Sequence, residues 1–276
     1  MAERIEYVIG PSRGKIQLKE VYQYRELFYF FIWRDVKVKY KQTALGVVWV
    51  VLQPILTVII FSVFFGRALN VPSAGLPYPV FVFSGLLLWN MFSGSVNTAG
   101  NSMLTHAPII KKIYFPRVII PVSAVLVAGI DFLIAFVAFI AMLLYYQTPV
   151  DFIKLLFFWP MAVLLMLCGT IGISCWLAAL NVKYRDVRYV IPFALQVALF
   201  LSPVIYPVSV LGNKFLDSLL AINPMYASIS FFRAPLIQDA SLDINLVLIS
   251  VASAVFFLFI GVQYFKKTEA DFADLA

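Results

Sequence analysis

The chain has 276 residues, of which 62% are hydrophobic and only 13% carry a charge. A water-soluble domain of this size could not cover so much apolar surface with so few charged side chains, so the composition indicates an integral membrane protein. The net charge of +7 would suggest a nucleic-acid partner in a soluble protein. Lysines and arginines gathered on one membrane face explain it here, and we expect no nucleic-acid partner.

Residues 1–44 form a polar and charged segment ahead of the first apolar stretch, with no secretory signal peptide visible. Within it, residues 20–41 hold a short aromatic and aliphatic block between basic flanks. The block is too short to span a bilayer, and its amphipathic mixture predicts a helix lying along the cytoplasmic membrane surface. A soluble helix that packs on a partner is the alternative. We therefore divide the chain into this segment and a membrane domain over residues 45–276.

Six stretches are apolar enough to cross a membrane as helices of about twenty residues. They are residues 46–65, 79–96, 118–146, 152–180, 189–205 and 246–265. The fifth is broken towards its end by Ser202-Pro203, because proline lacks the amide that a helix needs. The fold class is thus predicted to be all-α, with six spans.

The orientation follows from where the basic residues lie. Seventeen of the twenty-one fall in the N-terminal segment, in residues 97–117 and 181–188, and in the C-terminal tail. The other four, Arg67, Lys154, Lys214 and Arg233, fall in the alternate connections. Both termini are therefore predicted to be cytoplasmic.

The long connection over residues 206–245 is predicted to be a structured element of the outer face. It contains apolar pieces that are each too short to span, broken by Pro207, by Asn223-Pro224 and by Pro235. Re-entrant or surface-lying helices are the natural interpretation.

Residues 97–117 make a polar, basic connection on the cytoplasmic side, with prolines at 108 and 116. We expect it to be presented to a soluble motor subunit. His106, the only histidine of the chain, is interpreted as a surface residue of this segment. The connection over residues 181–188 is interpreted either as a basic membrane anchor with a local ion pair or as a second contact to the same subunit.

The sequence offers no catalytic constellation. Asp131 is the only acidic residue within the predicted spans, where a lone carboxylate costs roughly 2.5–3.5 kcal/mol to insert. It is expected to line a conduit, to pair with another helix, or to be capped by hydroxyls such as that of Ser123 or by neighbouring amides. We predict no catalytic residue, no metal site and no cofactor in this chain, so the energy for any transport has to come from outside it.

Aromatic residues are abundant in the spans, at 16% of the whole chain. Most are typical of lipid-facing or interfacial positions. The alternative is a conduit in which rings stack on sugar faces and amides bind hydroxyls. Its candidate residues are Trp49, Gln53, Phe81, Trp89, Asn90, Phe92, Gln196 and Phe200.

Six motifs follow one another in register from the start of the first span to the connection before the sixth. They are Leu45-Gly46-x-x-Trp49 with Gln53-Pro54, Ser84-Gly85 with Trp89, Lys111-Lys112-x-x-Phe115-Pro116-Arg117, Leu180-Asn181-Val182 with Tyr184-Arg185-Asp186, Ser202-Pro203-Val204, and Asn223-Pro224-Met225. Each alone is weak, but together they resemble the type-2 ABC exporter permeases for polysaccharides. The resemblance covers residues 24–265.

This resemblance implies a homodimer of six-span subunits in a bacterial inner membrane, each docked to a separate ATPase that binds ATP and magnesium. It implies an N-terminal interface helix, a coupling helix after the second span and gate helices before the sixth. The substrate would be an undecaprenyl-linked polysaccharide, with O-antigen as the first expectation. The implied coupling residues are Asn101, Ser102, Thr105, His106, Lys111, Lys112, Tyr184, Arg185 and Asp186. The implied outer-gate residues are Tyr206, Asn223, Pro224 and Tyr226.

Two alternatives remain open from the sequence. The first is a permease of related architecture that exports a small drug or a lipid. The second is a membrane-embedded glycosyltransferase or polymerase, whose acidic groups would cluster at an outer loop, whereas Asp217, Asp239 and Asp243 are scattered.

Overall fold

The computed structural model describes residues 18–41, 46–207, 213–238, 242–269 and 272. This part of the chain is helical and contains no strand. Its elements are α1 (Leu18–Gln23), α2 (Arg25–Lys41), α3 (Gly46–Phe61), the π-helical η1 (Ser62–Ala68), α4 (Tyr78–Thr105), α5 (Ala107–Ile110), α6 (Ile119–Tyr145), α7 (Phe152–Lys183), α8 (Val187–Phe200), α9 (Lys214–Ala221), α10 (Met225–Arg233) and α11 (Ile244–Thr268).

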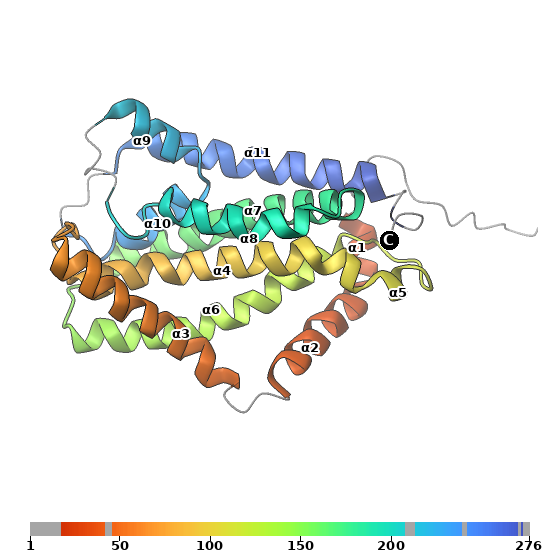
Figure 1. Cartoon of the computed structure of the whole chain (residues 1–276), viewed down its shortest axis with the longest axis horizontal. Coiled ribbons are helices and arrows are strands. Elements are labelled where there is room, and N and C mark those ends of the chain that lie inside the picture. Colours follow the sequence, from red (N-terminus) through yellow and green to blue (C-terminus); the bar gives the residue numbers. More distant parts are fainter. Residues whose placement is uncertain (1–17, 42–45, 208–212, 239–241, 270–271, 273–276) are drawn as a thin grey trace, which may run out of the picture.

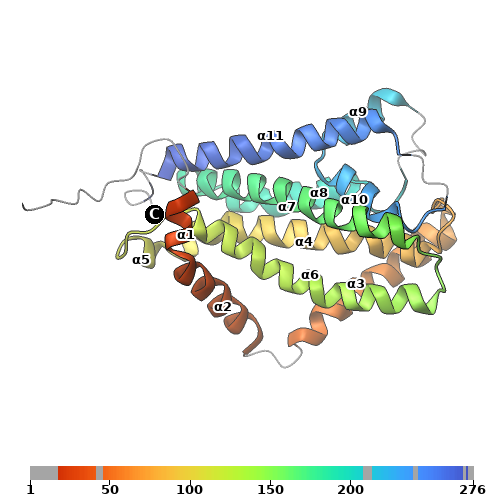
Figure 2. The ribbon, with the colours of Figure 1, turned by 180° about the vertical axis from the view of Figure 1, so that it is seen from behind.

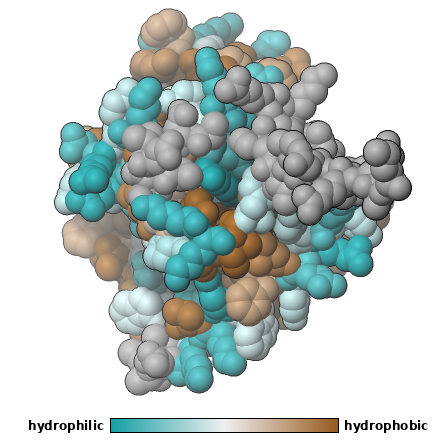
Figure 3. All heavy atoms as spheres, turned by 90° about the vertical axis from the view of Figure 1, so that its right-hand side faces the viewer, coloured by the Kyte–Doolittle hydropathy of each residue, from teal (hydrophilic) through white to brown (hydrophobic). Residues whose placement is uncertain are grey.

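The long helices run side by side between two ends of the molecule (Figures 1 and 2). We call one the basic end; it carries α1, α2, α5, the α7–α8 turn and the C-terminal end of α11. We call the other the hairpin end; it carries α9, α10 and η1. Figure 3 looks onto the basic end, where hydrophilic side chains surround a few apolar ones. Among the described residues, the elements that carry most of the predicted cytoplasmic lysines and arginines thus lie together at the basic end.

Among the described residues, five helices are long and apolar enough to cross a membrane: α3 with η1, α4, α6, α7 and α11. α8 has only 14 residues, or roughly 21 Å of helix, which is less than a bilayer's hydrocarbon thickness. α9 and α10 form a pair bent by 100°, which would be a sixth candidate if counted as one span. The chain is a multi-pass membrane protein, but its fifth predicted span is shorter than expected.

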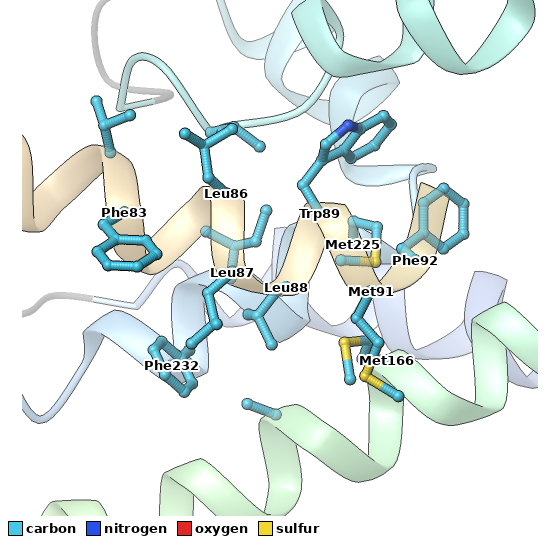
Figure 4. Close-up of a cluster of buried hydrophobic side chains, with 14 of the residues drawn as sticks. Phe83, Leu86, Leu87, Leu88, Trp89, Met91, Phe92, Met166, Met225 and Phe232 are labelled. Carbon is cyan, nitrogen blue, oxygen red and sulfur yellow. The ribbon is translucent and has the colours of Figure 1, made fainter. Parts of the chain in front are cut away.

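α4 is the central helix of the bundle, and 78% of its most apolar stretch of 18 residues is buried inside the protein. Its residues from Val80 to Trp89 are buried on all sides, as expected for a helix that is apolar all round. Figure 4 shows its large side chains interleaved with Met166 of α7 and with Met225 and Phe232 of α10. α4 thereby joins the two ends of the molecule.

The end of α4 corrects one predicted boundary. The second span was expected to stop at residue 96, but α4 continues to Thr105, so the first nine residues of the predicted loop 97–117 are helical. Hydropathy reports where a helix leaves the membrane, and a polar sequence can continue the same helix into water.

Two aspartates cap the first turns of helices, as is common for this side chain. Asp151 accepts hydrogen bonds from the amides that open α7, and Asp243 accepts them from the amides that open α11.

A second apolar cluster lies at the basic end, separate from the main core. It joins Phe31 of α2, Phe115 after α5, Cys175 of α7 and Phe265 of α11, all at most 2% exposed. Phe31 is the one buried residue of the charged helix α2, and it packs this helix against the bundle. Whether its other face lies on a membrane surface stays a prediction.

Candidate functional site

The predicted coupling segment is bound to α2 through His106. The Nδ1 atom of His106 lies 2.8 Å from the carbonyl oxygen of Ser102, and its Nε2 atom contacts Arg34 Nη2. Arg34 also donates to Asp35 Oδ1 from Nε at 2.9 Å and from Nη2 at 2.7 Å. The two ring nitrogens of His106 thus face groups on two different helices, α4 and α2. His106 therefore joins the end of α4 to α2.

His106 was expected to be a surface residue, and this is wrong. Its side chain is only 12% exposed, and its ring meets the buried Phe31 edge to face at a centroid distance of 5.6 Å. A short polar loop cannot show from sequence alone that its one imidazole folds back onto an aromatic ring 75 positions earlier.

The other predicted coupling residues divide into exposed and buried ones. Thr105, Lys111, Lys112, Tyr184, Arg185 and Asp186 are exposed at the basic end, and Asn101 is half-buried. Ser102 is only 3% exposed, and its hydroxyl donates to the Ala99 carbonyl at 2.6 Å. Ser102 thus faces the interior, and its side chain is not available to a partner subunit.

The two cytoplasmic connections predicted from the sequence are tied together by Asn181. Its amide nitrogen donates to the Gly100 carbonyl at 2.8 Å and to Asn101 Oδ1 at 3.0 Å. Asn181 is fully buried, so this contact fixes the end of α7 against the end of α4. The exposed residues of both connections therefore belong to one surface. The sequence showed Asn181 within a motif but gave no partner for it.

Asp131, near the middle of α6, pairs with another helix. It accepts hydrogen bonds from Lys39 Nζ and from the Tyr40 hydroxyl, both at the end of α2. Burial, the hydrogen bond to Asp131 and the charge of Asp131 together raise the pKa of Tyr40 far above its ordinary value, so the phenol stays protonated and donates. The expected hydroxyl partner, Ser123, instead donates to the Ile120 carbonyl at 2.8 Å.

The predicted conduit residues also divide into two groups. Trp49, Gln53, Asn90, Gln196 and Phe200 are exposed, whereas Phe81, Trp89 and Phe92 are at most 5% exposed. The buried three pack inside the subunit and cannot line a conduit in this arrangement; rings of this kind in a central helix are core residues. The sequence pattern did not show this, because α4 is apolar nearly all round over residues 80–89.

Two hollows join the exposed conduit candidates of α3 and α4, but not those of α8, to the Asp131 pair. One, of about 280 Å³, is lined by Trp49, Gln53 and Asn90 together with Lys39 and Asp131. The other, of about 680 Å³, lies between α2, α4, α5 and α6 and reaches from Asn90 and Asp131 to His106. Polar groups thus line a path from the basic end towards the middle of the bundle.

At the hairpin end, the predicted gate residues are packed against their neighbours. Pro224 and Tyr226 are buried, while Tyr206 and Asn223 are half-buried. The Asn223 amide donates to Ser202 Oγ at 2.6 Å, and the Tyr206 hydroxyl donates to the Phe200 carbonyl at 2.7 Å. The segment that follows α8 is therefore fastened to the start of α10.

Arg233, the last residue of α10, is buried at the hairpin end and was missed by the sequence reasoning, which counted it as an outer basic residue. It is only 5% exposed. It donates to Ser84 Oγ and to the carbonyls of Phe81, Pro203 and Val204 at 2.6–2.9 Å. Its signal in the sequence is an arginine within an apolar run, which in a membrane segment indicates a structural or functional role.

Comparison with known proteins agrees with this architecture. Residues 26–237 match the protein family described as ABC-2 type transporter. Among similar proteins, the O-antigen export system permease protein RfbA of Myxococcus xanthus is 28% identical over 93% of this chain and 98% of its own length. The protein of the same name from Klebsiella pneumoniae is 28% identical over 88% of this chain and 92% of its own.

A more distant relative is the polysialic acid transport protein KpsM of Escherichia coli, which is 20% identical over 86% of this chain and 91% of its own length. The matched region runs from α2 to the residues that follow α10. It includes the predicted coupling residues at one end and Arg233 at the other. With its membrane-length helices and this match over most of its length, the chain belongs to the ABC-2 type transporter family.

Proposed function

We propose that this chain is the membrane subunit of an ABC exporter that moves a lipid-linked polysaccharide, in the first instance O-antigen, across a bacterial inner membrane. The observation that carries the proposal is the similarity to O-antigen export permeases over 93% of the chain. Exposed polar groups such as Gln53 and Asn90, set beside Trp49, suit a substrate made of sugar rings and hydroxyls.

The energy comes from a separate ATPase subunit that binds ATP and magnesium and docks at the basic end. The exposed Thr105, Lys111 and Arg185 form its contact surface, because Asn181 holds the α4 and α7 ends together. The basic end is the cytoplasmic one, following the excess of lysine and arginine there. Movement of this surface is transmitted to α2 through His106. From α2 it is transmitted to α6 through the contacts of Lys39 and Tyr40 with Asp131.

The functional complex contains two copies of this chain, with the undecaprenyl-linked polymer passing between them. α3 and α8 expose rows of large apolar side chains, among them Trp49, Leu56, Phe193 and Phe200. Such faces are covered by lipid or by a second subunit in a membrane. Tyr206, Asn223 and the buried Pro224 and Tyr226 belong to the outer gate.

Site-directed cross-linking tests the docking surface. In a cysteine-free chain, Thr105→Cys on the exposed side of α4 is expected to cross-link to an ABC ATPase in membranes, recognised by its phosphate-binding loop peptide. Ser102→Cys, three residues earlier but buried, is the matched control and is expected not to react. Active complexes in which Thr105→Cys reaches no ATPase would disprove this docking surface.

Deletion of the gene tests the substrate class. Cells that lack the chain are expected to lose surface polysaccharide and to retain lipid-linked polymer inside. A drug exporter would instead change resistance to toxins and leave the polysaccharide intact, and that result would overturn the proposal.

A further inference from the structure

Arg233 is a cation held inside the protein by neutral groups. Within the part of the chain that the structure describes, no aspartate or glutamate forms an ion pair with it. Its guanidinium carbon lies 3.6 Å from the centre of the Phe81 ring, a cation–π contact. An arginine costs much to bury in a membrane protein unless every direction around it is satisfied, and here four hydrogen bonds and one ring provide that.

The hydrogen bonds of Arg233 join three separate segments. Two of them reach α4: Nε donates to Ser84 Oγ at 2.9 Å, and Nη2 donates to the Phe81 carbonyl at 2.8 Å. Nη1 donates to the Pro203 carbonyl at 2.6 Å and Nη2 to that of Val204 at 2.9 Å, both after α8. Arg233 itself is on α10, so one side chain connects all three.

The residues after α8 need such donors because they are not helical. α8 ends at Phe200, and irregular backbone at membrane depth is tolerated only where protein groups satisfy its carbonyls. Arg233 satisfies two of them, and the Tyr78 hydroxyl donates to a third, that of Ile205, at 2.9 Å. The break in the fifth span is thus held by side chains of α4 and α10.

Gly85 shows that the fit around Arg233 is tight. A Cβ atom added at Gly85 would lie 2.7 Å from Arg233 Nη2 and 3.0 Å from Val204 Cα, so a glycine is required for α4 to approach so closely. Three sequence motifs therefore meet at one place: Ser84-Gly85, Ser202-Pro203-Val204, and Asn223 through its bond to Ser202.

We propose that Arg233 is the positioning residue of the outer gate, fastening α10 and residues 202–206 to α4 so that they move as one block and keep the resting mouth closed. This rests on the proposed export function. Separating α10 and residues 202–206 from α4 would leave a cation and several carbonyls without partners in apolar surroundings, which costs free energy. We expect the substrate to displace the block as a whole.

The first test measures leakage without any polymer. Purified complexes in liposomes that enclose a small fluorescent anion are compared for the wild type, Arg233→Met and Arg233→Lys. Both variants are expected to leak about tenfold faster, because they lose hydrogen bonds that stabilise the closed state. A tenfold change in the closed–open equilibrium corresponds to roughly 1.4 kcal/mol. Arg233→Lys keeps the charge but not the forked geometry. A leak equal to that of the wild type in both would overturn the proposal.

Gly85→Ala tests the same block while leaving Arg233 in place, and it decides the matter if the Arg233 variants do not fold. We expect a raised leak with normal thermal stability. The matched control is Gly94→Ala on the same helix, where an added Cβ meets nothing within 4 Å. An equal leak in the two alanine variants would contradict the proposal.

A disulfide tests whether the block stays together during transport. Ser202→Cys with Asn223→Cys replaces two side chains that are 2.6 Å apart. If the block moves as one, the oxidised double-cysteine variant is expected to export polymer at the same rate as its reduced form. The two single-cysteine variants measure any effect of losing the hydrogen bond itself. Export that stops on oxidation and returns with a reductant would overturn the proposal. Failure of the wild type to export polymer would instead count against the proposed function, since the leak assay needs none.

Discussion

Asp131 is the residue that holds the free end of α2 to the membrane bundle. Asp131→Asn removes the ion pair with Lys39 but keeps an acceptor for Tyr40. We expect a loss of about 1 kcal/mol in stability, because Lys39 is half exposed and water already weakens the pair. Thermal unfolding of the purified complex measures it, and export should fall further than stability if α2 transmits movement to α6.

Two variants control this prediction. Glu26→Gln removes an exposed carboxylate from the first turn of the same helix and is expected to change neither stability nor export. The double variant Lys39→Met with Asp131→Asn closes a thermodynamic cycle. Strict additivity of the two single effects would mean that the ion pair contributes nothing.

The sequence predicts the chemical class of such residues but not their partners. Asp131 stood out because a carboxylate in an apolar stretch is costly, and Arg233 could have stood out for the same reason. Their contacts join positions 92 and 149 residues apart. Only the packing of the helices brings these positions together, and one sequence without its fold does not specify that packing.

Among the elements, α7 and α11 cross at a pair of glycines whose backbones nearly touch. An added Cβ at Gly172 would overlap the backbone of Phe257 and Leu258, and one at Gly261 would overlap the backbone of Gly172. Small residues at a crossing let membrane helices approach until their backbones touch. We therefore expect Gly172→Ala to destabilise the protein by about 1–3 kcal/mol, as an overpacked site does.

Thermal unfolding in detergent measures this effect. Gly94→Ala adds the same methyl group to α4 with open space around it and is expected to be neutral or slightly stabilising, since alanine favours a helix. Equal melting temperatures for the two variants would mean that α7 and α11 separate at little cost.

The elements themselves could largely be predicted, whereas their ends could not. Apolar length located the long helices α3, α6, α7 and α11 and the broken fifth span. It failed at α4, which continues as a polar helix to Thr105, because the end of the apolar stretch is not the end of the hydrogen-bonded helix. Residue type also failed on this helix, because three aromatic residues that were candidates for a conduit proved to be core residues.

On the scale of the whole molecule, we propose six crossings, although among the described residues only five helices have the length for one. α8 begins beside the end of α7 at the basic end, and α11 begins at the hairpin end (Figures 1 and 2). We therefore propose that the chain between them crosses the membrane. Fourteen helical residues cover roughly 21 Å, and the irregular residues 201–206, satisfied by Arg233 and Tyr78, complete the distance.

This topology predicts which positions a membrane-impermeant thiol reagent can reach in intact spheroplasts. With Cys168 and Cys175 replaced by alanine, Lys154→Cys and Lys214→Cys at the hairpin end should react without permeabilisation. Lys112→Cys, Arg185→Cys and Lys267→Cys at the basic end should react only after it. The pair formed by Arg185→Cys and Lys214→Cys isolates α8, because the two positions flank it. If both react from the same side, α8 does not cross, and Arg233 cannot serve as the support of a broken span.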